Sequence, residues 1–510
     1  MKAKKSRSGT TFDLPKNILQ EFSPELATPL TLLINNMFQE AEWPLHWKQE
    51  HVVPIPKVTS PVSEDDLRPI SLTPFFSKVA EHFVVDWLLE FIGEKIDFRQ
   101  YGGLKGNSVS HYVIEFINFV LASQESKEKT AVLACFIDFQ KAFMRQNHNI
   151  LIVKLSKLGV PGWLLKIVIS FLKDRTMKVK FGGCESMIKQ LPGGGPQGTL
   201  IALLLFLVLV NDLGFQGQSN NAGAIATSKH KIRMANELHL KFVDDLTIAE
   251  AINMDKTLVY SPGTIHNPQP LNFYSRTGHT LPVTKSKVYN QLESTSIYAE
   301  SNEMKINFAK TKLMLFFPCK TVEFMPNFVI QGIELELVSE TKLLGLHITS
   351  NLKWKSNTYK MISKANQRLW ILRRLKILGA QQNSLVDVYI KQIRSILEFG
   401  VPVWQGSITV HERADIERVQ KMAARIILGR SYHSYEDALL TLKIECLESR
   451  RVKLCLNFAL KAEVHPKFNR TYNTRRKKSK YLEVHSNHAR YEKSPLGYLT
   501  RLLNNYYSKP

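Results

Sequence analysis

Two adjacent carboxylates interrupt a run of alternating apolar and polar residues, and this pattern restricts the fold more than any other. Asp244 and Asp245 follow one alternating segment and precede another. The apolar positions on the two sides are Leu238, Leu240, Phe242, Leu246 and Ile248. A period of two predicts a β-hairpin with the acids at its tip. Because neighbouring like charges repel, a fold that holds them together typically binds a divalent cation there.

An Asp-Asp pair has little meaning by itself, since the chain contains a second one. Asp65 and Asp66 lie in the polar run 61–67, which is typical of a solvated loop. The importance of Asp244 and Asp245 therefore depends on residues elsewhere in the sequence.

The charge balance indicates a polyanionic partner. The chain of 510 residues has 68 Lys and Arg against 45 Asp and Glu, a net charge of +23. This excess favours nucleic acid over an anionic membrane, because no lipidation motif or strong amphipathic anchor is found. A hydrophobic content of 44% is ordinary for a globular protein, and the length suits two to four domains.

Cysteine usage and hydropathy predict the compartment. The five cysteines are scattered without CxxC spacing, which favours reduced thiols over disulfides or a zinc site. The N-terminus lacks the apolar core of a signal peptide. The longest apolar run, 200–210, is shorter than the roughly 20 residues of a membrane helix. We expect an intracellular protein, in the cytoplasm, the nucleus or both, that is neither secreted nor inserted in a membrane.

Apolar periodicity predicts both helices and strands. Helical spacing occurs in 24–37, 72–98, 109–122, 148–174, 200–209, 353–376 and 384–462. Strand-like runs occupy 131–137, 314–317 and 343–348, while 43–56 is expected to break up into short extended pieces at its prolines. Polar segments at 214–237 and 254–290 are expected to be loops or insertions around the hairpin. This irregular mixture predicts an α+β core followed by a basic, all-α region.

Asp138 is the acid most suited to join the pair. It ends the apolar run 131–137, and Phe143 follows five residues later. Carboxylates on neighbouring strands can hold two Mg²⁺ ions that activate a primer 3′-hydroxyl and stabilise the transferred phosphorus. Phe143 would then form a wall beside the incoming sugar. The alternative for Asp138 is a solvated acid at the end of a strand.

A glycine-rich turn, Pro192 to Thr199, precedes the helix at 200–209. Exposed amides at a helix start suit phosphate, and Gln197 is suited to contact a base or sugar. The spacing is neither a Walker loop nor a Rossmann fingerprint. Taken alone, an ordinary loop-to-helix turn is the simpler interpretation.

Six ordered motifs together resemble the reverse transcriptase of non-LTR (LINE-type) retrotransposons, over residues from about 40 to about 460. They are Leu67-Arg-Pro-Ile-Ser-Leu72, Phe136-Ile-Asp-Phe-Gln-Lys-Ala-Phe143, Gly195-Pro-Gln-Gly-Thr199, Phe242-Val-Asp-Asp245, Asn307-Phe-Ala-Lys-Thr-Lys312 and Leu343-Leu-Gly-Leu346. The resemblance implies a right-hand polymerase of fingers, palm and thumb with an antiparallel palm sheet. It implies a basic N-terminal extension at 1–40, fingers and palm at 41–350, a helical thumb and C-terminal region at 351–465, and a basic tail at 466–510.

The resemblance also implies roles for single residues. Asp138, Asp244 and Asp245 match the metal-binding acids, which would hold two Mg²⁺ ions, with Mn²⁺ as a substitute. Arg68 matches the basic residue of the fingers that contacts the triphosphate. The segment that lines the nucleotide and template pocket corresponds to Gly195, Pro196, Gln197 and Gly198. Lys310 or Lys312 matches the lysine that protonates the leaving pyrophosphate. Both would share one face of a strand, and Lys310 is preferred.

The basic segment 351–380 makes physical sense as the thumb helix. It contains eight Lys and Arg and no acid, with an apolar stripe along one side. The residues expected to contact the phosphate backbone are Lys360, Lys364, Arg368, Arg373 and Arg374. A solvated helix face is the alternative. The run Arg475 to Lys478 is equally consistent with RNA binding, with a nuclear import signal and with a disordered, solvated tail.

Four departures from the family pattern affect the expected activity. Met144 occupies a position where a second acid is usual, and Val243 replaces a small alanine beside the primer terminus. The chain leaves no room before residue 40 for the endonuclease domain that such elements usually carry, and it has no C-terminal Cys/His cluster.

The leading hypothesis is an RNA-directed DNA polymerase that uses an RNA template, a DNA primer and dNTPs. The second hypothesis is a remnant that binds nucleic acid without catalysis, and an intron-maturase type of polymerase fits the motifs less well. The sequence leaves the oligomeric state open.

Overall fold

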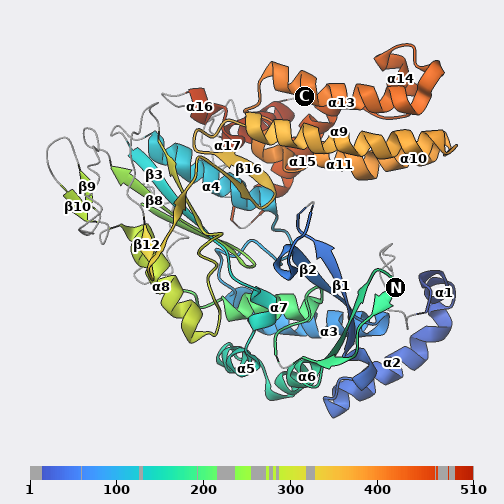
Figure 1. Ribbon diagram of the computed structural model, residues 1–510, viewed down its shortest axis with the longest axis vertical. Coiled ribbons are helices and arrows are strands. Elements are labelled where there is room, and N and C mark those ends of the chain that lie inside the picture. The colour runs from blue at the N-terminus through green and yellow to red at the C-terminus, as the bar shows by residue number, and fades with distance from the viewer. Residues whose placement is uncertain are drawn as a thin grey trace. The chain divides into compact units, whose positions relative to one another are not determined.

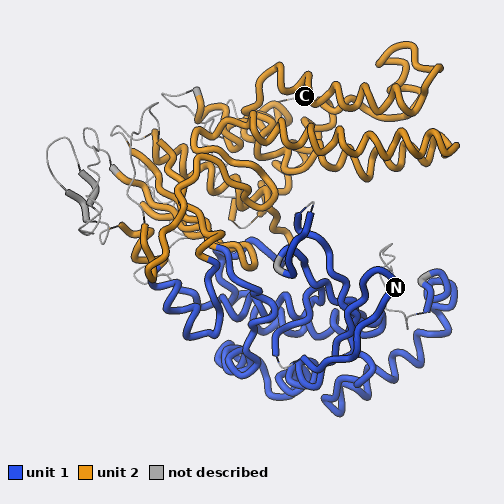
Figure 2. Tube along the Cα trace, viewed as in Figure 1, with its two compact units in different colours: residues 1–104, 138–216, 293–307 blue, residues 105–137, 217–292, 308–510 orange. Residues whose placement is uncertain are grey.

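Most of the chain is described in the computed structural model. The described residues are 14–58, 60–125, 130–191, 193–214, 236–253, 272–274, 280–282, 286–317, 328–465, 467–468, 481 and 489–508. They fall into two compact units, each assembled from separate stretches of chain (Figure 2). Unit 1 comprises 1–104, 138–216 and 293–307, and unit 2 comprises 105–137, 217–292 and 308–510.

Unit 1 is built around a mixed sheet. The strands run in the order β2-β1-β4-β5, and β6 also pairs with β4. β1 is antiparallel to β2 and parallel to β4. The strands are β1 (Gln49–Pro56), β2 (Leu67–Leu72), β4 (Thr176–Phe181), β5 (Cys184–Glu185) and β6 (Lys189–Gln190).

The core of unit 1 forms around helix α7, which is apolar on every side and buried along nearly its whole length. α3 and α5 both pack against α7, and α6 packs against α5. The helices of this unit are α1 (Lys16–Glu21), α2 (Ser23–Glu40), α3 (Phe75–Ile92), α5 (His148–Lys157), α6 (Gly162–Leu172) and α7 (Leu200–Leu209). Short 3-10 turns lie at Leu45–Trp47, Glu64–Asp66, Gly93–Lys95 and Ala142–Arg145.

Unit 2 contains the sheet that carries the predicted hairpin. Its order is β14-β11-β3-β8-β7, with β3 antiparallel to both β8 and β11. Every residue of β3 is buried, as expected for a continuous apolar run at the centre of a sheet, and α4 packs on this strand. The elements are α4 (Val109–Gln124), β3 (Thr130–Ile137), β7 (Glu237–Phe242), β8 (Asp245–Asn253), β11 (Lys312–Phe316) and β14 (Glu336–Leu337).

Helices dominate the rest of unit 2 (Figure 1). α9 packs along α13, and α17 packs against α15 and α4. A π-helical turn at Tyr389–Arg394 joins α10 to α11. The helices are α9 (Lys355–Ile377), α10 (Gln382–Val388), α11 (Ser395–Leu397), α12 (Val401–Trp404), α13 (Val410–Leu428), α14 (Tyr435–Thr441), α15 (Leu447–Glu463), α16 (Ala489–Glu492) and α17 (Pro495–Tyr507).

The remaining elements are short, apart from α8 (Lys287–Ser301), whose residues are divided between the units. Three short antiparallel pairs also occur among the described residues. They are β9 (Asn272–Tyr274) with β10 (Thr280–Pro282), β12 (Val329–Ile330) with β13 (Ile333–Glu334), and β15 (Glu340–Leu343) with β16 (Leu346–Thr349).

The α+β class with a helical C-terminal region is confirmed, but four details differ from the prediction. The segment 43–56 is not a series of broken pieces, because it contains the continuous strand β1. The run 343–348 is not a single strand but the turn of the β15–β16 hairpin, where Gly345 has φ +92°. The strands at 176–190 were not predicted. Residues 495–507, grouped with the basic tail, form the packed helix α17.

Two further predictions fall largely outside what is described. The run Arg475 to Lys478 and most of the polar segments 214–237 and 254–290 lie outside the described residues. Among the residues that are described, none of the helices has the length and apolar character needed to cross a bilayer.

Candidate active site

The predicted hairpin is present in unit 2. β7 and β8 pair with Phe242 opposite Asp245, so that Val243 and Asp244 form the turn. Val243 has φ +58°, a left-handed conformation that is strained for a β-branched residue. Valine at this position therefore strains the backbone of the turn that carries both acids.

Strand pairing brings the third acid position to the same end of the sheet. β3 ends at Ile137, and the partner of Ile137 on β8 is Leu246. Asp138 is the next residue after β3, and Asp245 is the residue before Leu246. Asp138 is half-buried.

The other Asp-Asp pair has a structural environment of a different kind. Asp66 ends a 3-10 turn and accepts hydrogen bonds from the amides of Val62 and Ser63 at 2.9 and 3.2 Å. This capping box is a turn motif within the polar run 61–67 rather than a cation site.

In unit 1, the glycine-rich turn is bound to the segment after Asp138. The amide of Gly195 donates to the carbonyl of Phe143 at 2.7 Å, and the amide of Gly194 donates to that of Gln146 at 3.1 Å. Gly194 has φ +81°, and a Cβ there would lie 2.8 Å from the Met144 carbonyl oxygen. Glycine is therefore required at this position by close backbone packing.

The same turn is bound to β2. The amide of Ser71 donates to the carbonyl of Gln197 at 2.8 Å, and Gly198 has φ +117° next to the Ser71 carbonyl. Arg68 lies on β2 with an exposed side chain. Unit 1 thus brings three of the predicted motifs, 67–72, 138–143 and 195–199, into one hydrogen-bonded cluster.

Two amides at the start of α7 are capped by side chains of the protein itself, which agrees with an ordinary loop-to-helix turn. Glu81 accepts a hydrogen bond from the amide of Leu200 at 2.8 Å, and Thr199 caps the amide of Ala202 at 3.3 Å. Burial raises the pKa of Glu81 to about 7, although the amide of Leu200 and the charge of Arg175 oppose this shift. Glu81 was missed at the sequence level, because nothing in its helical pattern marks it as a cap.

The Glu81 carboxyl predicts a pH dependence of stability. Its folded pKa lies above the ordinary value of 4.5, so its contribution is complete below pH 4.5 and is lost as the pH rises through about 7. Glu81→Gln keeps an oxygen acceptor for the Leu200 amide but cannot ionise. The fall in the free energy of unfolding with rising pH should therefore be smaller by up to about 3 kcal/mol. Urea unfolding between pH 5 and pH 8 measures it. Glu90→Gln, on the exposed side of the same helix, is the control, and parallel curves for wild type and Glu81→Gln would contradict the assignment.

Phe143 and Met144 lie together in the short 3-10 turn after Asp138. The Phe143 ring stacks on Phe206 of α7, with 5.3 Å between centroids. Met144 is 52% exposed. The Met144 side chain therefore lies at the surface and is not part of the apolar core of unit 1.

The two lysines of the 307–312 motif have different environments. Lys312 begins β11 and is ion-paired with Glu336 at 2.5 Å, while its ammonium also donates to the Ala309 carbonyl at 2.8 Å. Lys310 is exposed and lies in the turn before the strand. The idea that both share a strand face, which was the reason for preferring Lys310, is therefore wrong.

The basic side chains of α9 lie on its exposed side, as the amphipathic pattern predicted. Those that are exposed include all five named from the sequence: Lys360, Lys364, Arg368, Arg373 and Arg374. Lys360 is ion-paired with Glu340. Trp370 is 61% exposed and lies within cation–π distance of Arg374, at 5.8 Å. This face combines positive charge with an aromatic ring, which suits nucleic acid.

No cluster of three or more His, Cys, Asp or Glu side chains that could enclose a metal ion occurs within the described part of the chain. Asp138, Asp244 and Asp245 offer only oxygen donors, the ligand type that suits Mg²⁺.

Residues 55–348 match the family model described as "Reverse transcriptase (RNA-dependent DNA polymerase)". This match covers more than half of the chain, which therefore belongs to the reverse transcriptase family. The predicted resemblance to the enzymes of non-LTR retrotransposons is confirmed by similarity to proteins of Drosophila mobile elements.

The similar proteins include two mobile-element polymerases from Drosophila melanogaster. The "Probable RNA-directed DNA polymerase from transposon BS" is 24% identical over 415 residues, which are 79% of this chain and 41% of that protein. The "RNA-directed DNA polymerase from mobile element jockey" is 31% identical over 187 residues, 36% of this chain and 20% of that protein. The chain thus spans less than half of these relatives' length. Apo telomerase from Candida tropicalis is similar over 91% of this chain and 70% of that one, with 13% identity and a TM-score of 0.40.

Proposed function

We propose that the chain is an RNA-directed DNA polymerase that extends a DNA 3′-hydroxyl on an RNA template. The observation that carries this proposal is the register of β3, β8 and β7. Asp138 directly follows β3, Asp244 lies in the turn between β7 and β8, and Asp245 begins β8. Membership of the reverse transcriptase family supports it.

In this proposal the three acids would hold Mg²⁺, or Mn²⁺ in its place. Bound ions of this kind activate a hydroxyl and neutralise charge on the transferred phosphorus. Because the start of α7 is capped by Glu81, we assign the triphosphate to side chains such as Arg68 rather than to helix amides. Lys310 is the exposed candidate for protonating the pyrophosphate. Phe143 and the turn Gly195 to Gly198 would border the nucleotide.

A primer-extension assay tests the activity. Purified chain is mixed with an RNA template, an annealed DNA primer, dNTPs and Mg²⁺, and the products are resolved by length. Folded protein that incorporates no nucleotide with Mg²⁺ or Mn²⁺ would contradict the proposal. A DNA template of the same sequence in a parallel reaction measures the template preference.

The exposed face of α9 should supply affinity without sequence preference. Lys364→Ala combined with Arg368→Ala is expected to weaken binding of an RNA–DNA hybrid and to lower the slope of log K against log salt by roughly one to two. Fluorescence anisotropy at several salt concentrations measures both quantities. Lys391→Ala is the matched control, because Lys391 is exposed but ion-paired with Asp387 at 2.5 Å. Equal slopes for all three proteins would contradict the role of α9.

A second candidate function is nucleic-acid binding without catalysis. Met144 in place of the usual acid and the strained Val243 favour it. It requires salt-dependent binding, no nucleotide incorporation, and no effect of Asp244→Ala on binding. The primer-extension assay therefore separates the two candidates directly.

A further inference from the structure

Asn307 contacts Asp138 twice within unit 1. Its side-chain amide Nδ2 donates to Oδ2 of the Asp138 carboxylate at 3.3 Å. Its backbone N–H donates to the Asp138 carbonyl at 2.7 Å. Both the main chain and the side chain of Asn307 are therefore directed at a single residue, although the two lie far apart in the sequence.

The backbone contact belongs to a short strand-like pairing. The amide of Gln140 donates to the carbonyl of Lys305 at 2.8 Å, and Phe139 forms an antiparallel bridge with Ile306. Phe139 and Ile306 are both buried. This pairing fixes where the Asp138 backbone lies, so the side-chain contact from Asn307 acts on the orientation of the carboxylate.

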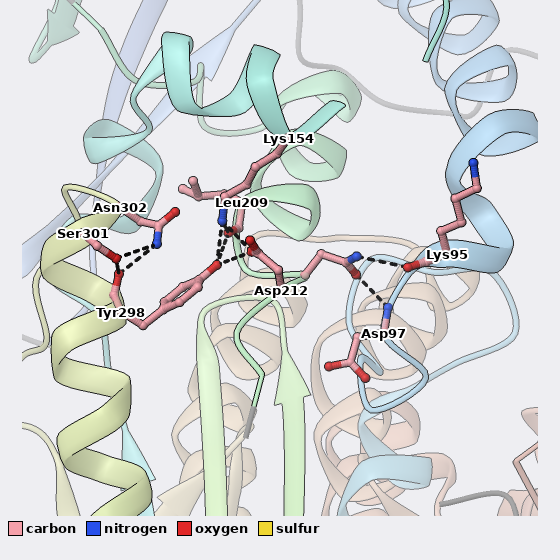
Figure 3. A network of polar contacts seen from close by, with 9 residues as sticks. Lys95, Asp97, Lys154, Leu209, Asp212, Tyr298, Ser301 and Asn302 are labelled. Atoms are coloured by element: carbon pink, nitrogen blue, oxygen red, sulfur yellow. Dashed lines mark hydrogen bonds and ion pairs between the residues drawn. The ribbon is translucent and has the colours of Figure 1, made fainter. Parts of the chain in front are cut away.

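The chain that leads to Asn307 is itself anchored. The Tyr298 hydroxyl of α8 lies 2.6 Å from the Leu209 carbonyl and 2.5 Å from the Asp212 carboxylate. Lys154 donates to the same two groups at 2.7 and 2.5 Å (Figure 3). Asn302 then donates to the Tyr298 carbonyl at 2.8 Å. The segment between the end of α8 and Asn307 is thus held at both ends within unit 1.

An amide is well suited to orient a carboxylate that binds a cation. A carboxylate has about four lone-pair sites, and one hydrogen bond from a neutral donor leaves the others available. An amide brings no positive charge, so it does not compete with the metal as lysine or arginine would. Partners of this kind fix the orientation of a ligand, and their loss typically costs about 10–100-fold in metal affinity or activity.

We propose that Asn307 is a positioning residue that holds the Asp138 carboxylate in the orientation required for divalent cation binding. This inference rests on the proposed function, in which Asp138 is a metal ligand. It gives the asparagine of the 307–312 motif a role that is separate from that of the lysines.

The test compares Asn307→Leu with wild type in the full chain. Leucine keeps the size of the side chain and removes the donor. Mn²⁺ binding, measured by electron paramagnetic resonance without nucleic acid, is expected to weaken about 10-fold, as after Asp138→Asn. In primer extension, kcat should fall by about 10–100-fold while KM for the primer–template changes less than about twofold. Asn149→Leu is the control, because Asn149 is exposed on α5.

The outcomes separate the inference from the function. Wild type that extends primers, with Asn307→Leu unchanged in Mn²⁺ affinity and kcat, overturns the inference alone. Wild type that extends no primer overturns the function, and the Mn²⁺ measurement then still decides whether Asn307 and Asp138 serve one cation site. If leucine prevents folding, as judged by circular dichroism, Asn307→Gln gives the same readouts, because it keeps the amide but displaces it by one methylene.

Discussion

Asp244→Asn is expected to abolish primer extension while the protein stays folded and bound to its template. Asparagine has the size of aspartate but lacks its charge, so it cannot replace a carboxylate that holds a cation. We expect kcat/KM to fall by roughly 10³-fold or more, which is more than about 4 kcal/mol of transition-state stabilisation. Asp138→Asn should have a similar effect, because it follows the strand paired with the one that Asp245 begins.

The control for this prediction is the second Asp-Asp pair in the sequence. Asp65→Asn makes the same chemical change in a turn of unit 1 and should leave extension within about twofold of wild type. Chelation of divalent ions with EDTA should reproduce the loss in wild type, and added Mg²⁺ should reverse it. Extension by Asp244→Asn at a rate close to that of wild type would exclude the proposed metal site.

Gly194→Ala should be strongly destabilising for so small a substitution. A Cβ at this position would lie 2.8–3.0 Å from three backbone atoms of Met144, which cannot move aside as a flexible side chain can. The residue also has φ +81°, which costs an alanine about 1–2 kcal/mol. Together with overpacking, the expected loss in the free energy of unfolding is about 2–4 kcal/mol. Urea unfolding followed by tryptophan fluorescence measures it.

Gly182→Ala separates the two causes. Gly182 has φ +59°, but a Cβ there would meet nothing within 4 Å. Its loss should therefore be limited to the backbone term of about 1–2 kcal/mol. If the two alanine variants prove equally stable, the packing of the turn against the segment after Asp138 does not explain why position 194 is glycine.

The elements predicted well are those whose burial is uniform or strongly periodic. β3 is continuous and apolar because it is central in its sheet, and α7 is apolar throughout because α3 and α5 both pack on it. The strand β4 was missed because it is short and half-exposed. The alternation of Met177, Val179 and Phe181 with lysines was the available signal.

The candidate site was predictable in its acids but not in its supports. Asp244 and Asp245 follow from alternation, since a hairpin tip is a local feature of sequence. The contacts of Glu81 with the start of α7 and of Asn307 with Asp138 join distant segments, so no local pattern encodes them. The glycine-rich turn could not be separated from an ordinary loop-to-helix turn by its sequence, because the carboxylate that caps the α7 amide of Leu200 comes from the distant helix α3.

The pairing of β3 also has a consequence for how the chain reaches its folded state. Both neighbours of β3 come much later in the sequence, since β8 begins at Asp245 and β11 at Lys312. During synthesis this apolar strand must wait for more than 100 residues before its first partner exists, so contact order is high and folding of unit 2 should be slow. The entropy of closing such long connections grows only with the logarithm of their length. Evolution can therefore lengthen or shorten the chain between these strands at little thermodynamic cost, provided that the strands themselves are kept.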